Sequence, residues 1–240
     1  MRKVDGALAF FGRLLLAPRC LVCAEPGADG LDLCAECLAS LPWNRNACRC
    51  CGLPLAQAAD QCGRCLKSPP PFASTQAALR YEFPLDRLLP RFKFHGDLAA
   101  GALLGTLMVR GLAAAPRPQA LLPVPLHPAR LRERGYDQAL ELARVLSAVD
   151  GPPVCRDRLF RVRATAAQSR LDAGSRRRNV HGAFAVRAGP SLPAHVALVD
   201  DVMTTGATVR ECARTLLAAG VRRVDVWVVA RAPPRVMSAK

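Results

Sequence analysis

Downstream of residue 72, short apolar runs alternate with longer stretches in which apolar side chains recur every three or four positions. The apolar runs predict buried strands at 77–83, 120–125, 195–199 and 224–230. The longer stretches predict helices at 98–112, 137–148 and 208–219. Gly220 follows the last helix, where a capping glycine belongs. Strands that alternate with helices are typical of an α/β fold with a doubly wound, mostly parallel sheet, in which ligands bind at the carboxyl ends of strands.

The first 68 residues lack this alternation and carry a repeat of cysteines instead. Nine of the eleven cysteines lie between residues 20 and 65, and eight of these form four Cys-x-x-Cys pairs in a pattern that recurs after 28 residues. Such a repeat of four thiolates in two pairs is typical of a double zinc ribbon, because soft sulfur ligands favour zinc, with iron the main competitor. The predicted ligands are Cys20, Cys23, Cys34 and Cys37 for one structural zinc and Cys48, Cys51, Cys62 and Cys65 for the other.

Two details of the repeat leave alternatives open. Cys50 has no counterpart in the first unit, so we interpret it as a bystander, although it could replace Cys48 or Cys51 as a ligand. A disulfide framework could also explain paired cysteines. Residues 1–19 are not typical of a secretory signal, and this favours the metal interpretation.

Composition divides the chain into three parts. Residues 1–19 predict an N-terminal amphipathic helix, residues 20–68 the double zinc ribbon, and residues 72–235 the α/β domain, with the prolines 69–71 at the boundary. No apolar run approaches the ~18 residues of a membrane-spanning helix. We therefore expect a cytoplasmic protein without membrane insertion.

The formal net charge is +15, and 30 of the 34 basic residues are arginines. This balance suits polyanionic partners such as nucleic acid, anionic lipid or a phosphorylated small molecule. Biased codon usage would explain an excess of arginine and alanine equally well.

The segment 198–209, LVDDVMTTGATV, follows the predicted strand 195–199 with two acids and a turn rich in hydroxyls. Asp200 and Asp201, emerging from the strand end, can accept hydrogen bonds from the vicinal hydroxyls of a ribose or approach a metal ion held by a phosphate. Gly206 lets the backbone approach a ligand, and the amides that open the next helix can face an anion. A helix N-cap would need one such residue rather than the whole set. The segment therefore predicts a site for a ribose 5-phosphate.

Residues 196–209 resemble the phosphoribosyl pyrophosphate-binding motif of type I phosphoribosyltransferases. Together with the segments 121–143 and 161–184 and the cysteine repeat, the chain resembles the ComF family from Cys20 to about Arg231. The resemblance implies catalytic roles for Asp200 and Asp201, which would hold the ribose hydroxyls. The implied 5-phosphate loop consists of Thr204, Thr205, Gly206, Ala207 and Thr208.

The resemblance also implies a diphosphate site at the turn 126–130, with positive charge from Arg130, Arg132 and Arg134, and magnesium bound together with the phosphoribosyl pyrophosphate. A mobile loop that closes over the diphosphate would include Arg163, Thr165, Gln168 and Arg170. Asp137 departs from the family pattern, which has asparagine there. An aspartate can still cap the following helix, but it lacks the amide donor.

Two classes of function fit these features. A transferase would move the ribosyl phosphate to a nitrogenous acceptor and release pyrophosphate. The alternative is a nucleic-acid-binding protein, or one that senses phosphoribosyl pyrophosphate, without turnover. The ComF resemblance implies a role in natural transformation, with single-stranded DNA and DNA-uptake proteins as partners, although few aromatic residues are available to stack on bases.

Overall fold

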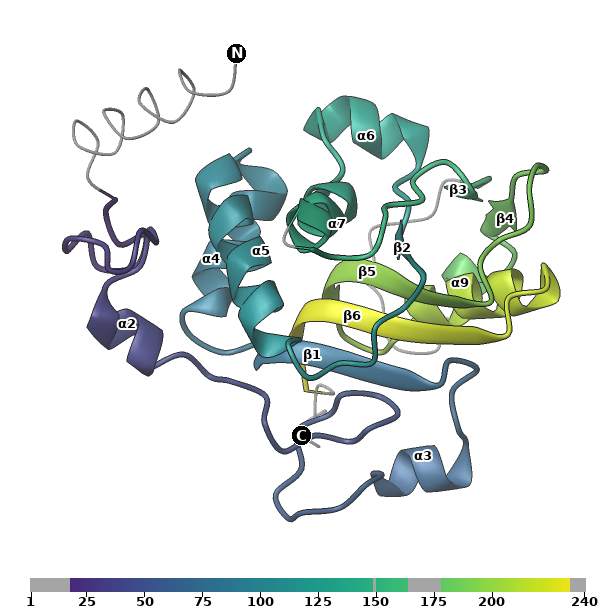
Figure 1. Cartoon of the computed structure of the whole chain (residues 1–240), viewed down its shortest axis with the longest axis horizontal. Coiled ribbons are helices and arrows are strands. Elements are labelled where there is room, and N and C mark those ends of the chain that lie inside the picture. Colours follow the sequence, from purple (N-terminus) through teal and green to yellow (C-terminus); the bar gives the residue numbers. More distant parts are fainter. Residues whose placement is uncertain (1–17, 149, 164–177, 234–240) are drawn as a thin grey trace, which may run out of the picture.

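The computed structural model describes residues 18–148, 150–163 and 178–233. At its centre lies a sheet of four parallel strands in the order β1–β6–β5–β2 (Figure 1). The strands are β1 (Ser74–Arg80), β6 (Arg223–Arg231), β5 (His195–Met203) and β2 (Ala120–Pro123). The predicted α/β fold with a mostly parallel sheet is confirmed.

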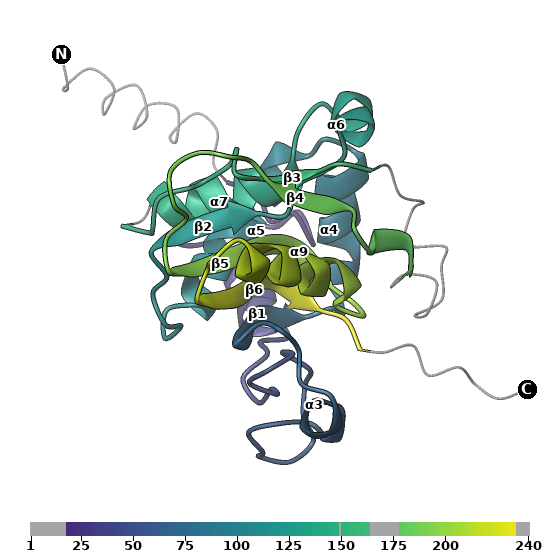
Figure 2. The same cartoon turned by 90° about the vertical axis from the view of Figure 1, so that its right-hand side faces the viewer.

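Helices cover both faces of this sheet (Figures 1 and 2). On one face lie α4 (Leu85–Phe94), α5 (Leu98–Gly111) and α7 (Gln138–Ala148), and α9 (Ala207–Ala218) lies on the other. A short helix, α6 (Pro128–Arg134), follows β2, and a small antiparallel ribbon of β3 (Leu159–Arg161) and β4 (Phe184–Val186) contacts α9.

Alternation along the strands divides the apolar side chains between two clusters. Ala197 and Val199 of β5 pack in the cluster that contains α4, α5 and α7, whereas Val196 and Leu198 pack in the cluster that contains α9. Successive side chains of a strand point to opposite faces, so a strand buried on both faces needs a continuous apolar run. The sequence supplies such runs in both β5 and β6.

The two cysteine repeats pack against different faces of the domain. Cys20 and Leu33, beside α2 (Ala35–Ala39), join the cluster of α4 and α5. Cys48 and Cys65, beside α3 (Gly63–Lys67), join the cluster of α9. Figure 1 shows α2 on the side of the molecule where α4 lies, and Figures 1 and 2 both show α3 below β1. Each of the two apolar clusters thus includes residues of one cysteine repeat.

The internal duplication is visible in the backbone as well as in the cysteines. An isolated antiparallel bridge joins Arg19 to Pro26 in the first repeat, and another joins Ala47 to Pro54 in the second. Each bridge links the residues on either side of a Cys-x-x-Cys pair. Both repeats therefore fold into the same knuckle.

Several predicted boundaries are wrong. The strand expected at 195–199 continues to Met203, so Asp200 and Asp201 lie inside β5 rather than beyond its end. Asp200 pairs with Val228 in the sheet, which extends the strand past the apolar run. The strand expected at 77–83 occupies 74–80, and the one expected at 120–125 ends at residue 123. The helices predicted at 98–112, 137–148 and 208–219 agree with α5, α7 and α9 within one residue at each end.

Two helices of the α/β domain, α4 and α6, were not predicted, nor were the short helices α2 and α3 among the cysteines. Some expectations fall on residues outside those that the structure describes. α6 begins at Pro128, and the His127 side chain accepts a hydrogen bond from the Ala129 amide at its start. α4 contains Pro90, which hid its helical pattern. The N-terminal helix expected at 1–19 and the end of the domain at 234–235 lie almost wholly outside the described residues. Within the described ranges, every helix is too short or too polar to cross a membrane.

Candidate functional site

Eight cysteines form two separate groups of four, as predicted. The sulfur atoms of each group lie within 4.8 Å of one another. The first group is Cys20, Cys23, Cys34 and Cys37, and the second is Cys48, Cys51, Cys62 and Cys65. We call them the first and second four-cysteine sites.

The spacing of the sulfurs fits a tetrahedral metal centre. The Sγ atoms of Cys23 and Cys34 are 3.6 Å apart, and those of Cys51 and Cys62 are 3.7 Å apart. A tetrahedron with Zn–S bonds of about 2.3 Å has edges of about 3.8 Å, whereas sulfurs in a disulfide are only about 2.05 Å apart. The described cysteines are all free thiols, so the disulfide alternative is not adopted. With four protein ligands each, these are structural zinc sites rather than catalytic ones.

Cys50 is not a member of the second four-cysteine site. It is buried, and its backbone carbonyl accepts a hydrogen bond from the Thr75 hydroxyl at 2.8 Å. Its position between two ligands therefore serves to dock the second knuckle on β1.

Asp200 and Asp201 lie on β5 near its carboxyl end, and their side chains follow the alternation of the strand. Asp201, only 5% exposed, is on the same face as α4, and its carboxylate forms a close ion pair with the Lys93 ammonium. Asp200 is on the face of α9, and its carboxylate accepts a hydrogen bond from the Asp201 backbone amide at 2.9 Å. The two acids are therefore neighbours with different surroundings.

These surroundings separate the acidities of the two carboxyl groups. Burial and the adjacent charge of Asp201 raise the pKa of Asp200 to about 8. Burial also disfavours ionisation of Asp201, but Lys93 outweighs it and holds the pKa of Asp201 below its usual value. Burial opposes the charge of Lys93, yet the two carboxylates keep the pKa of Lys93 above its ordinary range. Near neutral pH the site thus holds one proton on Asp200 and an ionised Asp201–Lys93 pair.

The loop after β5, which ends at Met203, leads directly into α9. Gly206, the N-cap of α9, has φ +75°. Gly206 makes no side-chain capping hydrogen bond to the helix. The Ala207 amide makes only a long contact of 3.4 Å with the Thr205 hydroxyl. Thr204 and Thr208 lie in the same loop. Amides at the start of α9 follow this turn directly, and binding of an anion there stays a prediction.

Two of the predicted arginines lie near basic residues that in turn interact with the acids. The positive charge of Arg134 acts to lower the pKa of Lys93. The Arg134 guanidinium lies 5.5 Å from the centre of the Phe94 ring. Burial and then the charge of Arg130 lower the pKa of Arg161, while Asp200 opposes this effect. Arg132 is exposed on α6. The acids are thus surrounded by positive charge from α4, α6 and β3.

Asp137 caps α7, as its sequence position suggested. Its carboxylate accepts a hydrogen bond from the Leu140 amide at 3.1 Å and approaches the Leu126 amide at 3.4 Å. It therefore ties the start of α7 to the loop that follows β2.

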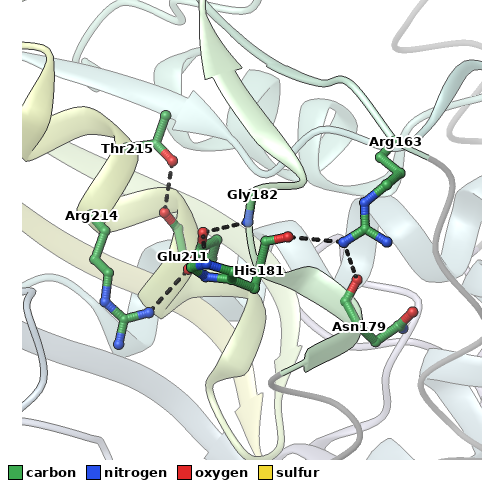
Figure 3. A network of polar contacts seen from close by, with 7 residues as sticks. All are labelled: Arg163, Asn179, His181, Gly182, Glu211, Arg214 and Thr215. Carbon is green, nitrogen blue, oxygen red and sulfur yellow. Dashed lines mark hydrogen bonds and ion pairs between the residues drawn. The ribbon is translucent and has the colours of Figure 1, made fainter.

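A network of polar contacts joins α9 to the segment around residue 180 (Figure 3). The carboxylate of Glu211, 7% exposed, accepts hydrogen bonds from the Gly182 amide at 2.7 Å and from Arg214 at 3.0 Å. Arg163 donates to the carbonyls of Asn179 and His181. Arg163 and Asn179 flank residues 164–177, which include the predicted loop positions Thr165, Gln168 and Arg170 and lie outside the described residues.

Beside this network, a cavity of about 460 Å³ opens next to α9. Most of its polar lining is basic. The lining consists of Arg178, Val180, His181, Ala207, Arg210, Glu211 and Arg214. Because Ala207 also belongs to the loop at the start of α9, the cavity adjoins the candidate phosphate site.

Sequence reasoning missed Lys93, Arg161 and Glu211. Lys93 reaches Asp201 across 108 positions of sequence, and no local pattern encodes such a contact. One signal was present: Lys93 is one of only four lysines and stands between two phenylalanines. A lysine in such an apolar setting is expected to find a buried counter-charge.

Comparison with known proteins gives a consistent result. Residues 11–66 match the family described as double zinc ribbon domain. The chain is 35% identical over 218 residues to DNA utilization protein YhgH of Salmonella typhi, which covers 88% of this chain and 89% of that protein. It is 38% identical over 160 residues to competence protein F of Haemophilus influenzae, covering 63% and 70%. Competence protein ComFC of Streptococcus pneumoniae is 25% identical over 158 residues, covering 66% and 68%.

Proposed function

Because the chain belongs to the ComF family of competence protein F and DNA utilization protein YhgH, we propose that it binds phosphoribosyl pyrophosphate and supports the uptake or use of DNA. One observation carries the first half of this proposal. A pair of acids on β5, of which Asp201 is buried and Asp200 partly buried, is followed at once by a glycine-containing turn and the N-terminus of α9. The acids suit the diol of a ribose, and the turn suits its 5-phosphate.

The roles of the residues follow from their surroundings. Asp201, kept ionised by Lys93, would accept hydrogen bonds from the ribose hydroxyls, while the 204–208 loop would donate its amides to the 5-phosphate. Arg130 and Arg134 would face the diphosphate, which would bring its magnesium ion with it. Asp200, with a pKa of about 8, would change its protonation state when a cation binds near it.

Binding of phosphoribosyl pyrophosphate tests this proposal directly. We expect saturable, magnesium-dependent heat of binding in calorimetry with the full chain. Asp201→Asn should weaken binding about 10- to 100-fold, because charge-assisted hydrogen bonds contribute about 1.5–3 kcal/mol each. The matched control is Asp157→Asn, which neutralises an exposed acid that pairs with Arg156 on the surface. Absence of saturable binding, or equal affinities of the two variants, would contradict the proposal.

Transferase turnover is a separate step of the same proposal. If the site catalyses transfer, incubation with phosphoribosyl pyrophosphate and a panel of nitrogenous bases should release pyrophosphate and consume one base. Saturable binding without pyrophosphate release would instead identify a protein that senses the ligand. Either result is compatible with the proposed binding of phosphoribosyl pyrophosphate at this site.

A role in DNA handling is supported by a different observation. The chain carries a net charge of +15, and the cavity beside α9 is lined by Arg178, Arg210 and Arg214. Its relatives are named for competence and for DNA utilization. A cavity with this basic lining suits the phosphate backbone of single-stranded DNA.

A further inference from the structure

Arg231, the last residue of β6, lies between the second four-cysteine site and the loop that follows β5. Its side chain is completely buried. The guanidinium Nε donates to the Cys51 carbonyl at 2.8 Å, and Nη1 donates to the carbonyls of Met203 at 2.9 Å and Thr204 at 2.7 Å. One side chain therefore connects a zinc ligand residue to the backbone that begins the candidate phosphate loop.

The charge of Arg231 lacks a carboxylate partner within the part of the chain that the structure describes. Its Nη2 atom is buried and makes no hydrogen bond to the described residues. A buried guanidinium without a counter-charge is costly. Zinc with four thiolates carries net negative charge, so the metal-loaded second site supplies the compensating charge beside Arg231.

Further contacts fix the second knuckle to the same end of the sheet. The Thr75 amide donates to the Arg49 carbonyl at 2.9 Å, and the Ala232 amide donates to the Met203 carbonyl at 3.0 Å. With the bond from the Thr75 hydroxyl to Cys50, these contacts join the knuckle, β1, β6 and the loop into one polar assembly. A shift of the knuckle would therefore move the guanidinium and the carbonyls that it holds.

We propose that Arg231 is a positioning residue through which the second zinc site fixes the carbonyls of Met203 and Thr204, and with them the geometry of the 204–208 loop. The inference rests on the proposed function only where that loop is taken to bind a phosphate. The metal itself has no contact with the ligand. Its effect reaches the loop through the buried guanidinium and the backbone carbonyls of Cys51, Met203 and Thr204, and the same guanidinium also donates to the Ala232 carbonyl.

The first four-cysteine site provides a natural comparison. It packs on the opposite face of the sheet, and its link to the domain is a bond from Arg91 of α4 to the Leu21 carbonyl at 2.8 Å. Apart from the Leu21 carbonyl, Arg91 pairs with Asp97, which does not belong to the 204–208 loop. Loss of the first metal should therefore leave the loop nearly unchanged.

Hydrogen exchange of the backbone amides of residues 204–208, measured on the full chain without ligand, tests the proposal. In Arg231→Met we expect exchange at least about tenfold faster than in wild type, with two zinc ions still bound per chain by elemental analysis. Cys62→Ser, which removes one ligand of the second site, should give the same acceleration. The matched variant Cys23→Ser should lose one zinc ion and keep the wild-type exchange rate in the loop.

Two results would overturn the proposal. One is a wild-type exchange rate of the loop in Arg231→Met. The other is an equal acceleration in Cys23→Ser and Cys62→Ser, which would indicate general loosening of the fold. If Arg231→Met does not fold, the comparison of the two cysteine variants still decides. Because no ligand is present, failure of this proposal is distinguishable from failure to bind phosphoribosyl pyrophosphate.

Discussion

Two adjacent carboxylates differ in acidity because each meets a different face of the sheet. Asp201 points to α4, where Lys93 stabilises its charge, whereas the partly buried Asp200 lies on the face of α9 beside the charge of Asp201. Perturbed acidities of this kind are common at functional sites, where a ligand or cation replaces the missing charge. The pair thus combines an ionised acceptor with a carboxyl group ready to lose its proton.

The raised pKa of Asp200 predicts a pH-dependent stability. On folding, this pKa rises from 3.8 to about 8, so the folded chain keeps a proton that the unfolded chain has lost. Wild-type stability should therefore fall as the pH rises from about 4 to about 8. Asp200→Asn removes this loss. The difference in free energy of unfolding between the variant and wild type should therefore shift in favour of the variant by on the order of 2 kcal/mol from pH 5 to pH 8.

Urea unfolding at the two pH values provides the measurement. Asp157→Asn serves as the control, since its carboxylate is exposed and should give a difference that does not change with pH. A pH-independent difference for Asp200→Asn would show that Asp200 ionises normally in the folded chain.

At the scale of elements, the sequence predicts the parallel sheet and its main helices well, because they follow from strong local patterns. The apolar runs around Leu198 and Val226 are buried on both faces, and only strands of such a sheet need that pattern. The four-cysteine sites follow from spacing alone. Both features are encoded within a few residues of chain.

The missed features depend on contacts between distant segments. β5 continues through Asp200 because β6 offers Val228 as a pairing partner, and this overrides the low strand propensity of aspartate. The pairing of Lys93 with Asp201 and the bridge made by Arg231 arise only once the chain has folded. The sequence therefore predicts where the site lies, but not the charges that tune it.

The turn at the start of α9 should be sensitive to a single methyl group. An added Cβ at Gly206 would lie 2.6 Å from the Met203 Cε, and the residue has φ +75°. Gly206→Ala should lower the free energy of unfolding by about 1–2 kcal/mol and weaken binding of phosphoribosyl pyrophosphate about tenfold or more. Thermal unfolding and calorimetry measure the two effects.

Gly220→Ala is the matched control for this change. Gly220 has φ +95° at the other end of α9, and a Cβ there would meet no atom within 4 Å. It should show the cost of the backbone conformation without any loss of ligand affinity. Equal affinities of the two variants would mean that the turn does not contact the ligand.

At the scale of the whole molecule, the net charge of +15 predicts salt-dependent binding of single-stranded DNA. The logarithm of the affinity for a short oligonucleotide should fall with the logarithm of the salt concentration with a slope of several units. Arg210→Gln and Arg214→Gln, which change the cavity beside α9, should each reduce that slope by about one.

Fluorescence anisotropy over a range of salt concentrations gives this slope. Arg117→Gln is the control, because Arg117 is exposed and contacts the Asp150 carbonyl away from the cavity. Affinity that does not depend on salt would exclude the polyanion interface. An equal effect of Arg117→Gln would place the interface elsewhere on the surface.

The strand order β1–β6–β5–β2 also bears on how the chain is made on the ribosome. β6 is the last strand to be synthesised, yet it lies in the middle of the sheet, between strands that do not touch each other. Until residue 231 has been added, β1 and β5 each expose an unpaired edge and apolar faces. The central sheet therefore cannot be completed before synthesis is nearly finished, whereas the two knuckles are able to close around metal much earlier.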